Sequence, residues 1–434
     1  MEPEERKEII DRLKKNPVYS MSLGGKELFH SNMLAWLLMR DGNKQIKNFF
    51  GIEENEVVLN VFRERKNLDL IIVYANKTVI GNIEQKTGKE EFDDPDSYLL
   101  GDESRKKHSC FDKLKFIIIE NKFKSIPEKT QLEEYSKKLK SNTQIIYRRS
   151  LKNNDLRCFL FAPQIVLENA LGFENKTGFG ESQKVNDVTW EAKSYEGYND
   201  ILKCLVDDTP EGIIIKYYSE MITDLLVILK KWLKEEDIER KSTTPDANNI
   251  ELLKQIRFYD IYTKLWYGMT QKQIERKFSV LKNYPNRRFY GMTHSLGLFE
   301  WKYEYDEKLL VGVQIQNTSF RVFVEPYYKY KPNENRLFSS LNNISELEKI
   351  IKGWGSKILN EAFASKNHEQ LSDEDYKCLQ FDNFKYVQRS FDGIMPKIDD
   401  LAVVILSAMQ QLTDSIINSE LENEIQHCVQ GINK

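Results

Sequence analysis

The sequence predicts an α/β protein, with a mixed β-sheet flanked by helices in its first half and an α+β domain in its second half. In the first half, short apolar and β-branched runs alternate with amphipathic helical segments, which is the pattern of a sheet covered by helices. In the second half, three strand-like runs stand close together between helical segments. A chain of 434 residues is too long for one ordinary core, so we expect two main domains, residues 1–208 and 209–434.

Composition and charge narrow the class of protein. Charged residues make up 30% of the chain and hydrophobic residues 40%, which is typical of a folded globular protein. A net charge of −3 argues against a large, uniformly basic surface for nucleic acid but leaves room for a local basic groove. The five cysteines form no CxxC pair, so we expect no structural zinc site. We see no signal peptide and no run of 18 apolar residues, so we expect a cytoplasmic protein without a membrane segment.

The elements of the first half follow from periodicity. A helix over 23–38 is largely apolar yet has a polar stripe formed by Glu27, His30 and Ser31. Residues 85–113 are polar and rich in turn formers, so we expect a loop inserted into the sheet. The other elements predicted in this half are a helix at 4–15, strands at 57–65, 68–74, 78–83 and 116–120, a helix at 127–141, strands at 143–147 and 157–161, and a helix around 190–206.

One strand ends in an unusual way. In Phe116-Ile-Ile-Ile-Glu-Asn-Lys122, an aliphatic run stops on a carboxylate and an amine that leave the strand on the same face. Burying either charge costs several kcal/mol unless it is paired or bound to a metal ion. We therefore expect Glu120 and Lys122 to lie where a cation meets an anionic substrate.

The neighbouring strand supplies a second carboxylate. Hydrolysis of a phosphodiester requires a hard cation, and Mg²⁺ is held by one or two carboxylates together with waters. Asp69 and Glu120 provide the carboxylates if their strands are neighbours, and the backbone carbonyl of Asn121 is a possible third oxygen ligand. Lys122 is suited to position or deprotonate the attacking water and to stabilise charge on the phosphate.

These residues resemble the PD-(D/E)XK nuclease superfamily, in particular its RecB-like members with a QxxxY motif. The resemblance rests on Asp69, on the Glu120/Lys122 pair and on Gln131-Leu-Glu-Glu-Tyr135, and it covers about residues 20 to 205. The segment from Lys26 to Trp36 also looks like the first helix of one bacterial branch of nuclease-like proteins. The resemblance implies a restriction-endonuclease-like core, Mg²⁺- or Mn²⁺-dependent cleavage of DNA, and service in defence against foreign DNA or in repair.

The resemblance also implies a role for each residue. Asp69 corresponds to the first metal carboxylate, although Leu68 replaces the usual proline before it. Glu120 and Lys122 correspond to the E-x-K pair, and Gln131 and Tyr135, one helical turn apart, hold a phosphate or order Lys122. The predicted catalytic residues are Asp69, Glu120, Lys122, Gln131, Tyr135 and Glu27, and the predicted metal ligands are Asp69, Glu120, Asn121 and Glu27. Weaker candidates are His30, as a histidine ligand, and Glu64, as a support for the site.

A second E-x-K pair competes with the first. Glu84 and Lys86 lie closer in sequence to Asp69 than Glu120 does, and this spacing is the more typical one. The strand before Glu120 is more apolar, and Glu120 alone is followed by a helix with the Gln-x-x-x-Tyr pattern. We therefore favour Glu120 and Lys122 and keep the other pair as the alternative.

The second half has a strongly aromatic sheet. One face of its first strand alternates Phe299, Trp301, Tyr303 and Tyr305 with polar residues, so it packs on helices or recognises a ligand. Cations and aromatics mix at 287–290 and 327–331, which suits either contact with nucleic acid or a guarded sheet edge. The elements predicted here are helices at 212–238, 247–266 and 270–282, strands at 297–305, 308–316 and 319–325, and helices at 344–365 and 398–423.

The sequence is compatible with two functions. The first is a magnesium-dependent nuclease acting on nucleic acid, DNA more than RNA, whose C-terminal domain recognises the substrate, a regulator, a protein partner or a second copy of the chain. The second is a catalytically inactive module that keeps the nuclease fold for nucleic-acid binding or assembly. Metal binding distinguishes them, because only an intact Asp69/Glu120 site binds a divalent cation in competition with substrate.

Overall fold

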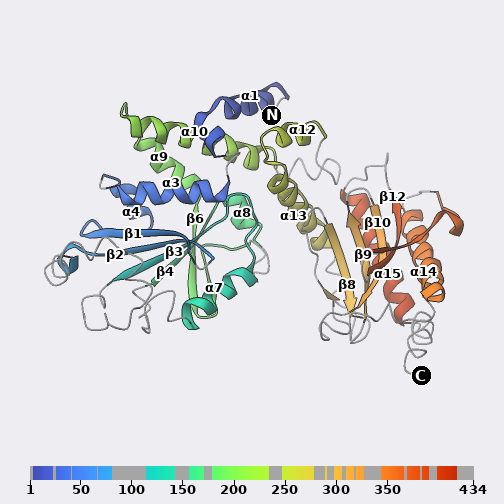
Figure 1. The fold of residues 1–434 in the computed structure, drawn as a ribbon. Helices are drawn as coiled ribbons and strands as arrows, with labels where there is room; N and C mark the ends of the chain where they lie inside the picture. The colour runs from blue at the N-terminus through green and yellow to red at the C-terminus, as the bar shows by residue number, and fades with distance from the viewer. Residues whose placement is uncertain are drawn as a thin grey trace. The chain divides into compact units, whose positions relative to one another are not determined.

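The computed structural model describes most of the chain in separate stretches. These are residues 3–22, 26–40, 42–65, 67–80, 114–141, 156–170, 178–233, 247–277, 289–290, 298–304, 309–316, 319–326, 344–365, 369–381, 384–390 and 398–417. The chain forms two compact units, each described by itself below (Figure 1). The first comprises Met1–Trp232 and Glu251–Ile261, and the second comprises Leu233–Ile250 and Tyr262–Lys434.

A mixed sheet forms the centre of the first unit. Over the described residues it has six strands in the order β1-β2-β3-β4-β6-β5. β2 pairs antiparallel with β1 and β3, β4 pairs parallel with β3 and β6, and β5 closes the edge antiparallel to β6. The strands are β1 Glu56–Arg65, β2 Leu68–Asn76, β3 Lys115–Asn121, β4 Leu156–Ala162, β5 Ser182–Val185 and β6 Val188–Ser194. A mixed sheet with flanking helices is what the sequence predicts.

Helices cover both faces of this sheet (Figure 1). Tyr195 of α9 stacks on Phe161 of β4, and Phe49 of α4 meets the same ring edge-on, so these helices share one face. On the opposite face, Trp190 of β6 donates a hydrogen bond to Ser136 of α7 over 3.0 Å. The helices of this unit are α1 Pro3–Lys15, α2 Pro17–Met21, α3 Glu27–Met39, α4 Lys44–Phe49, α7 Lys129–Ser141, α8 Gln164–Glu168, α9 Tyr195–Cys204 and α10 Pro210–Lys231.

The strand predicted at 78–83 is wrong over its described part, because residues 77–80 are helical. The side chain of Asn76 accepts hydrogen bonds from the backbone N–H and the hydroxyl of Thr78, at 3.0 and 2.9 Å. An Asn that bonds two residues ahead starts a turn, and this ends β2. β2 pairs with β1 and with β3. The predictions for 85–113 and 143–147 fall outside the described residues.

The helix predicted around 190–206 begins later than expected. Residues up to Ser194 belong to β6, which forms a hairpin with β5 through Asn186 and Asp187, both with positive φ (47° and 62°). Two such residues form the turn that suits a two-residue hairpin. The side chain of Ser194 then accepts a hydrogen bond from Gly197 N over 3.2 Å, so this serine is the N-cap of α9.

Helix α10 belongs to the first unit. It starts with Thr209, whose hydroxyl accepts from Gly212 N, and it packs against α9 and α2. Its buried face includes Tyr218 and Ile222. The boundary predicted at residues 208 and 209 therefore falls inside a packed pair of helices, while the compact unit continues to Trp232.

The second unit contains an antiparallel sheet backed by two helices. The described strands lie in the order β11-β12-β10-β9-β8-β7, and α14 and α15 pack on each other and on this sheet. Gly355 of α14 lies close against Val322 and Val387, which identifies the helix-covered face. Its elements are β7 Phe289–Tyr290, β8 Leu298–Glu304, β9 Leu309–Gln316, β10 Ser319–Pro326, α14 Ile344–Ala364, β11 Cys378–Phe381, β12 Phe384–Ser390 and α15 Ile398–Ile417. The residues of α12 Ala247–Gln255 and α13 Tyr259–Lys277 are divided between the two units.

The aromatic face of β8 is part of this core. Trp301 pairs with Val313, which pairs in turn with Val322 on the helix-covered face, and Trp301 is fully buried. At this position the aromatic face packs inward. Arg287, Arg288 and the aromatic-rich segment 327–331 lie outside the described residues. Over the stretches that the structure describes, no helix is both long and apolar enough to cross a membrane.

Candidate functional site

The pairing of β2 with β3 brings the two predicted carboxylates together. Leu70 pairs with Ile119, so Asp69 and Glu120, one residue further, lie opposite each other and share the face covered by α7. The strands are apolar on both faces, and Ile117, Ile118 and Ile119 are fully buried. Full burial of each such side chain contributes about 1.5–3 kcal/mol. The end of β3 is therefore held firmly in the sheet.

The two oxygens of the Glu120 carboxylate differ in their hydrogen-bond partners. Oε1 accepts from Lys122 Nζ at 2.8 Å and from Gln131 Nε2 at 2.9 Å, with the Tyr135 hydroxyl at 3.5 Å. In the part of the chain that the structure describes, Oε2 is buried and has no hydrogen-bond partner. Because an unsatisfied buried carboxylate oxygen is costly, this atom is available for a proton or a cation.

Burial shifts both carboxyl groups toward the protonated form. It raises the pKa of Glu120 to about 8, and the nearby charge of Asp69 adds to the increase while Lys122 opposes it. Burial also raises the pKa of Asp69 to about 6, against the hydrogen bond that Asp69 Oδ2 accepts from Asn121 N at 2.7 Å. A bound cation would favour the ionised form of both carboxyls and so lower both pKa values.

Lys122 is held as a cation. Only 11% of its side chain is exposed, and burial alone lowers its pKa. The combined charges of Glu120, Glu27 and Asp69 outweigh burial and raise the pKa of Lys122 above its usual value. A lysine in this state is suited to stabilising charge and positioning a substrate oxygen, and less suited to removing a proton from water.

Helix α7 presents Gln131 and Tyr135 to the same carboxylate. Gln131 Nε2 donates both to Glu120 and, over 2.8 Å, to the Tyr135 hydroxyl. Burial and the charge of Glu120 raise the pKa of Tyr135 to about 12, so its hydroxyl stays protonated. The structure therefore brings together Asp69, Glu120, Lys122, Gln131 and Tyr135, five of the predicted residues.

Glu27 reaches the site from the other face. Its Oε1 accepts from Lys124 N at 2.9 Å and from Ser125 Oγ at 2.7 Å, so it holds the loop that follows β3. Its charge nevertheless contributes to the pKa shifts of Asp69 and Glu120. The hydrogen bonds describe a support for the loop, and a role for Glu27 as a metal ligand stays a prediction.

The two weaker candidates lie in different surroundings. His30 is fully buried, stacks on Phe123 with centroids 4.2 Å apart, and shares a hydrogen bond of 3.0 Å with Tyr218. The structure thus places His30 in aromatic packing behind the sheet. Glu64 lies on β1 across from Asp69, has a φ of 51°, and contributes to the raised pKa of Asp69. Glu84 and Lys86, the alternative pair, lie outside the described residues.

Side-chain contacts that the sequence did not predict complete the site. The side chain of Asn121 contacts Ser31 of α3 and Tyr195 of α9. The sequence indicated Asn121 only for its backbone carbonyl and did not indicate a contact with Tyr195. These contacts join positions far apart in the chain, so no local pattern signals them.

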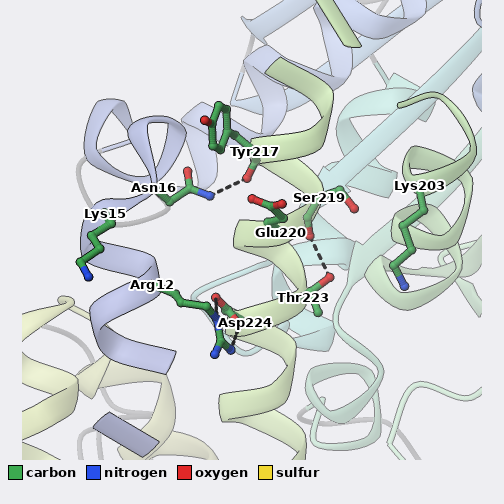
Figure 2. A pocket seen from close by; sticks show the side chains of 9 residues that line it. All are labelled: Arg12, Lys15, Asn16, Lys203, Tyr217, Ser219, Glu220, Thr223 and Asp224. Atoms are coloured by element: carbon green, nitrogen blue, oxygen red, sulfur yellow. Dashed lines mark hydrogen bonds and ion pairs between the residues drawn. The ribbon is translucent and has the colours of Figure 1, made fainter. Parts of the chain in front are cut away.

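A separate cavity of about 590 Å³ lies among α1, Asn16, α9 and α10 (Figure 2). Its polar groups largely bond to one another: Arg12 pairs with Asp224 at 2.6 Å, and Asn16 donates to the Tyr217 carbonyl at 2.8 Å. It contains none of the predicted site residues. The site residues that the sequence predicts therefore lie outside this cavity, and five of them gather where β2 begins and β3 ends.

Few candidate metal ligands lie where β2 begins and β3 ends. Among the described residues, no group of three or more His, Cys, Asp or Glu side chains is arranged to hold a metal ion. Mg²⁺ requires only one or two carboxylates plus waters, so Asp69, the free oxygen of Glu120 and the Asn121 carbonyl fit it in number and kind.

Comparison of the chain with protein-family models, curated proteins and solved structures found no match.

Proposed function

We propose that the first unit is a metal-dependent nuclease that hydrolyses phosphodiester bonds in DNA with Mg²⁺ or Mn²⁺. The motifs resemble the PD-(D/E)XK superfamily, and a restriction-endonuclease-like core agrees with the order of helix α3, strands β1 to β3, helix α7 and strand β4. The same resemblance favours a role in defence against foreign DNA or in repair.

The observation that carries the proposal is the state of Glu120. Its carboxyl group is 1% exposed, faces Asp69, and keeps one oxygen without a partner in the described part of the chain. A purely structural carboxylate at such a position would be satisfied by hydrogen bonds, or replaced by an apolar residue at little cost. Carboxyl groups with strongly shifted pKa values that lie together at the ends of neighbouring strands are typical of functional sites.

Each residue has a role that follows from its contacts. Asp69, Glu120 and the Asn121 carbonyl would hold the cation, which when bound supplies charge neutralisation for the phosphate. Lys122, fixed as a cation beside Glu120, binds a non-bridging phosphate oxygen and stabilises the charge that develops there. Gln131 and Tyr135 orient Glu120 by contacting Oε1, which would leave Oε2 for the cation.

The proposal is tested with the purified full chain on single- and double-stranded DNA, with RNA in parallel, in Mg²⁺ or Mn²⁺. We expect metal-dependent cleavage of DNA that Lys122→Ala reduces by a factor on the order of 100 or more, because charge stabilisation at one oxygen is worth several kcal/mol. Glu120→Gln should abolish it by removing a ligand charge. Activity that persists in Glu120→Gln would favour Glu84 and Lys86 as the catalytic pair.

A matched control comes from the same helix. Glu134 is exposed on α7, next to Tyr135, so Glu134→Gln changes the charge near the site without touching it. This variant should cleave like the original chain and exposes any contaminating nuclease. A chain inert toward all substrates with both metals would overturn the proposal.

The second candidate is an inactive nucleic-acid-binding or assembly module. One observation favours it: Lys122 and Gln131 already satisfy the oxygen of Glu120 that they contact, so part of the site is closed on itself. Titration with Mn²⁺ separates the candidates. Binding of nucleic acid without Mn²⁺ binding, unchanged in Asp69→Asn, would support the inactive module.

A further inference from the structure

The side chain of Asn121 joins the end of β3 to two helices. Nδ2 donates to Ser31 Oγ at 3.0 Å and to the Glu27 carbonyl at 3.2 Å, both on α3. Oδ1 accepts from the Tyr195 hydroxyl of α9 at 2.8 Å. Asn121, Ser31 and Tyr195 are fully buried. Both hydrogens of this amide and its oxygen are thus engaged, so the side chain has one fixed orientation.

The backbone of the same residue is part of the candidate site. Asn121 N donates to Asp69 Oδ2 at 2.7 Å, and the next amide, Lys122 N, donates to the Phe161 carbonyl of β4 at 2.8 Å. The peptide groups on both sides of Asn121 are therefore tied to the neighbouring strands. The orientation of the Asn121 carbonyl, the proposed third ligand, follows from these ties.

Tyr195 is itself held rigidly. Its ring stacks on Phe161 with centroids 4.0 Å apart and meets Phe123 edge-on at 4.5 Å. It is the first residue of α9, directly after the N-cap Ser194. A ring fixed in this way directs its hydroxyl at Asn121 with little freedom to rotate away.

We infer that Tyr195 and the side chain of Asn121 are positioning residues, which orient the Glu120–Lys122 segment so that Asp69, Glu120 and the Asn121 carbonyl converge on one cation. This inference rests on the proposed function. Groups that orient metal ligands in this way change metal affinity by about 10 to 100-fold when removed. Neither residue touches the substrate in this scheme.

The same helix offers a matched control. Tyr198 is also fully buried and meets Phe161 edge-on at 5.3 Å, but its hydroxyl has no hydrogen-bond partner among the described residues. Tyr195→Phe and Tyr198→Phe therefore remove the same atom from similar surroundings. Only the first removes a contact to the site.

Three readouts test the inference in the full chain: hydrogen exchange of the segment 116–125 without metal, Mn²⁺ affinity by calorimetry, and kcat separately from KM. Tyr195→Phe should speed exchange in this segment, weaken Mn²⁺ binding by about tenfold and lower kcat with little change in KM. Tyr198→Phe should match the original chain in all three. Ser31→Ala, a smaller change on the α3 side, should shift the readouts in the same direction if Tyr195→Phe fails to fold.

The outcomes separate this inference from the proposed function. A folded Tyr195→Phe protein with unchanged exchange, affinity and kcat overturns the inference, as does an equal effect of Tyr198→Phe. A chain that binds no Mn²⁺ and cleaves nothing overturns the proposed function, and the ligand-orienting role of Tyr195 falls with it. In that case, faster hydrogen exchange in Tyr195→Phe would show only that the contact between Tyr195 and Asn121 stabilises the fold.

Discussion

At the scale of single residues, Glu120 makes the stability of the fold depend on pH. Its pKa is about 8 in the folded protein because of burial and the charge of Asp69, against 4.5 for an ordinary glutamate. Below pH 4.5 it is protonated in both the folded and the unfolded states and costs nothing. As pH rises toward 8, the unfolded chain loses the proton first, so folding becomes progressively less favourable.

The first prediction concerns this pH window in metal-free protein. Between pH 5 and 8, the free energy of unfolding of the original chain should fall relative to that of Glu120→Gln, by up to about 1.4 kcal/mol per pH unit. Chemical denaturation in EDTA at several pH values measures the difference. Glu134→Gln, which alters an exposed carboxylate, should show only a constant offset. Parallel pH profiles for Glu120→Gln and the original chain would contradict the assigned state of Glu120.

The sequence predicted some of these residues better than others. Asp69, Glu120 and Lys122 could be predicted because a charged residue at the end of an aliphatic strand is unusual and can be recognised in the sequence. The contact of Asn121 with Tyr195 joins residues far apart in the chain, and its detection requires the parallel placement of β3 and β4 with α9 behind them. His30 matched a helical polar stripe, yet its environment is set by Phe123 and Tyr218, which lie in other elements.

At the scale of elements, α7 works as a support for the end of β3. Its residues Leu132 and Leu139 are buried, which fixes the helix against the sheet and turns Gln131 and Tyr135 toward Glu120. The sequence predicted this helix from spacings of three and four. The hairpin of β5 and β6 was missed because its short strands have little apolar alternation, and the N-cap at Ser194 was not recognised.

The second prediction separates the two polar residues of α7. Gln131→Ala should lower kcat/KM about tenfold or more, because it removes a well-formed hydrogen bond to a charged acceptor. Tyr135→Phe should cost about threefold or less, since its hydroxyl lies 3.5 Å from Glu120 Oε1. Steady-state kinetics at saturating Mn²⁺ measures both. An equal or larger effect of Tyr135→Phe would show that this hydroxyl contacts the substrate.

At the scale of the whole molecule, the chain forms two compact units, and the first continues past residue 208 to Trp232. The predicted boundary lies in Asp207-Asp-Thr-Pro-Glu-Gly212, whereas in the structure Asp207 and Thr209 start α10: the Thr209 N–H donates to Asp207 Oδ1 at 3.0 Å, and the Thr209 hydroxyl accepts from Gly212 N at 3.0 Å. Linkers and helix N-termini use the same polar residues. Only the packing of the helix that follows distinguishes them.

The third prediction follows from that packing. α10 buries Tyr218, Ile222 and Leu225, and an ion pair from Asp224 to Arg12 joins it to α1. A fragment of residues 1–208 leaves the partner surfaces of α9 and α2 exposed, so it should lack a cooperative thermal transition and bind a hydrophobic dye. A fragment of residues 1–261 retains α10 and residues 251–261, so it should unfold cooperatively.

Circular dichroism and dye fluorescence on both fragments provide the measurement, with Arg12→Ala in the longer fragment as a graded test. Loss of this ion pair leaves Asp224, whose side chain is 11% exposed, without its partner. An uncompensated, mostly buried charge destabilises more than a surface pair does, so the melting temperature should fall by several degrees. If the fragment of residues 1–208 unfolded as cooperatively as the longer one, α10 would be an attachment to the first unit and the boundary would return to residue 208.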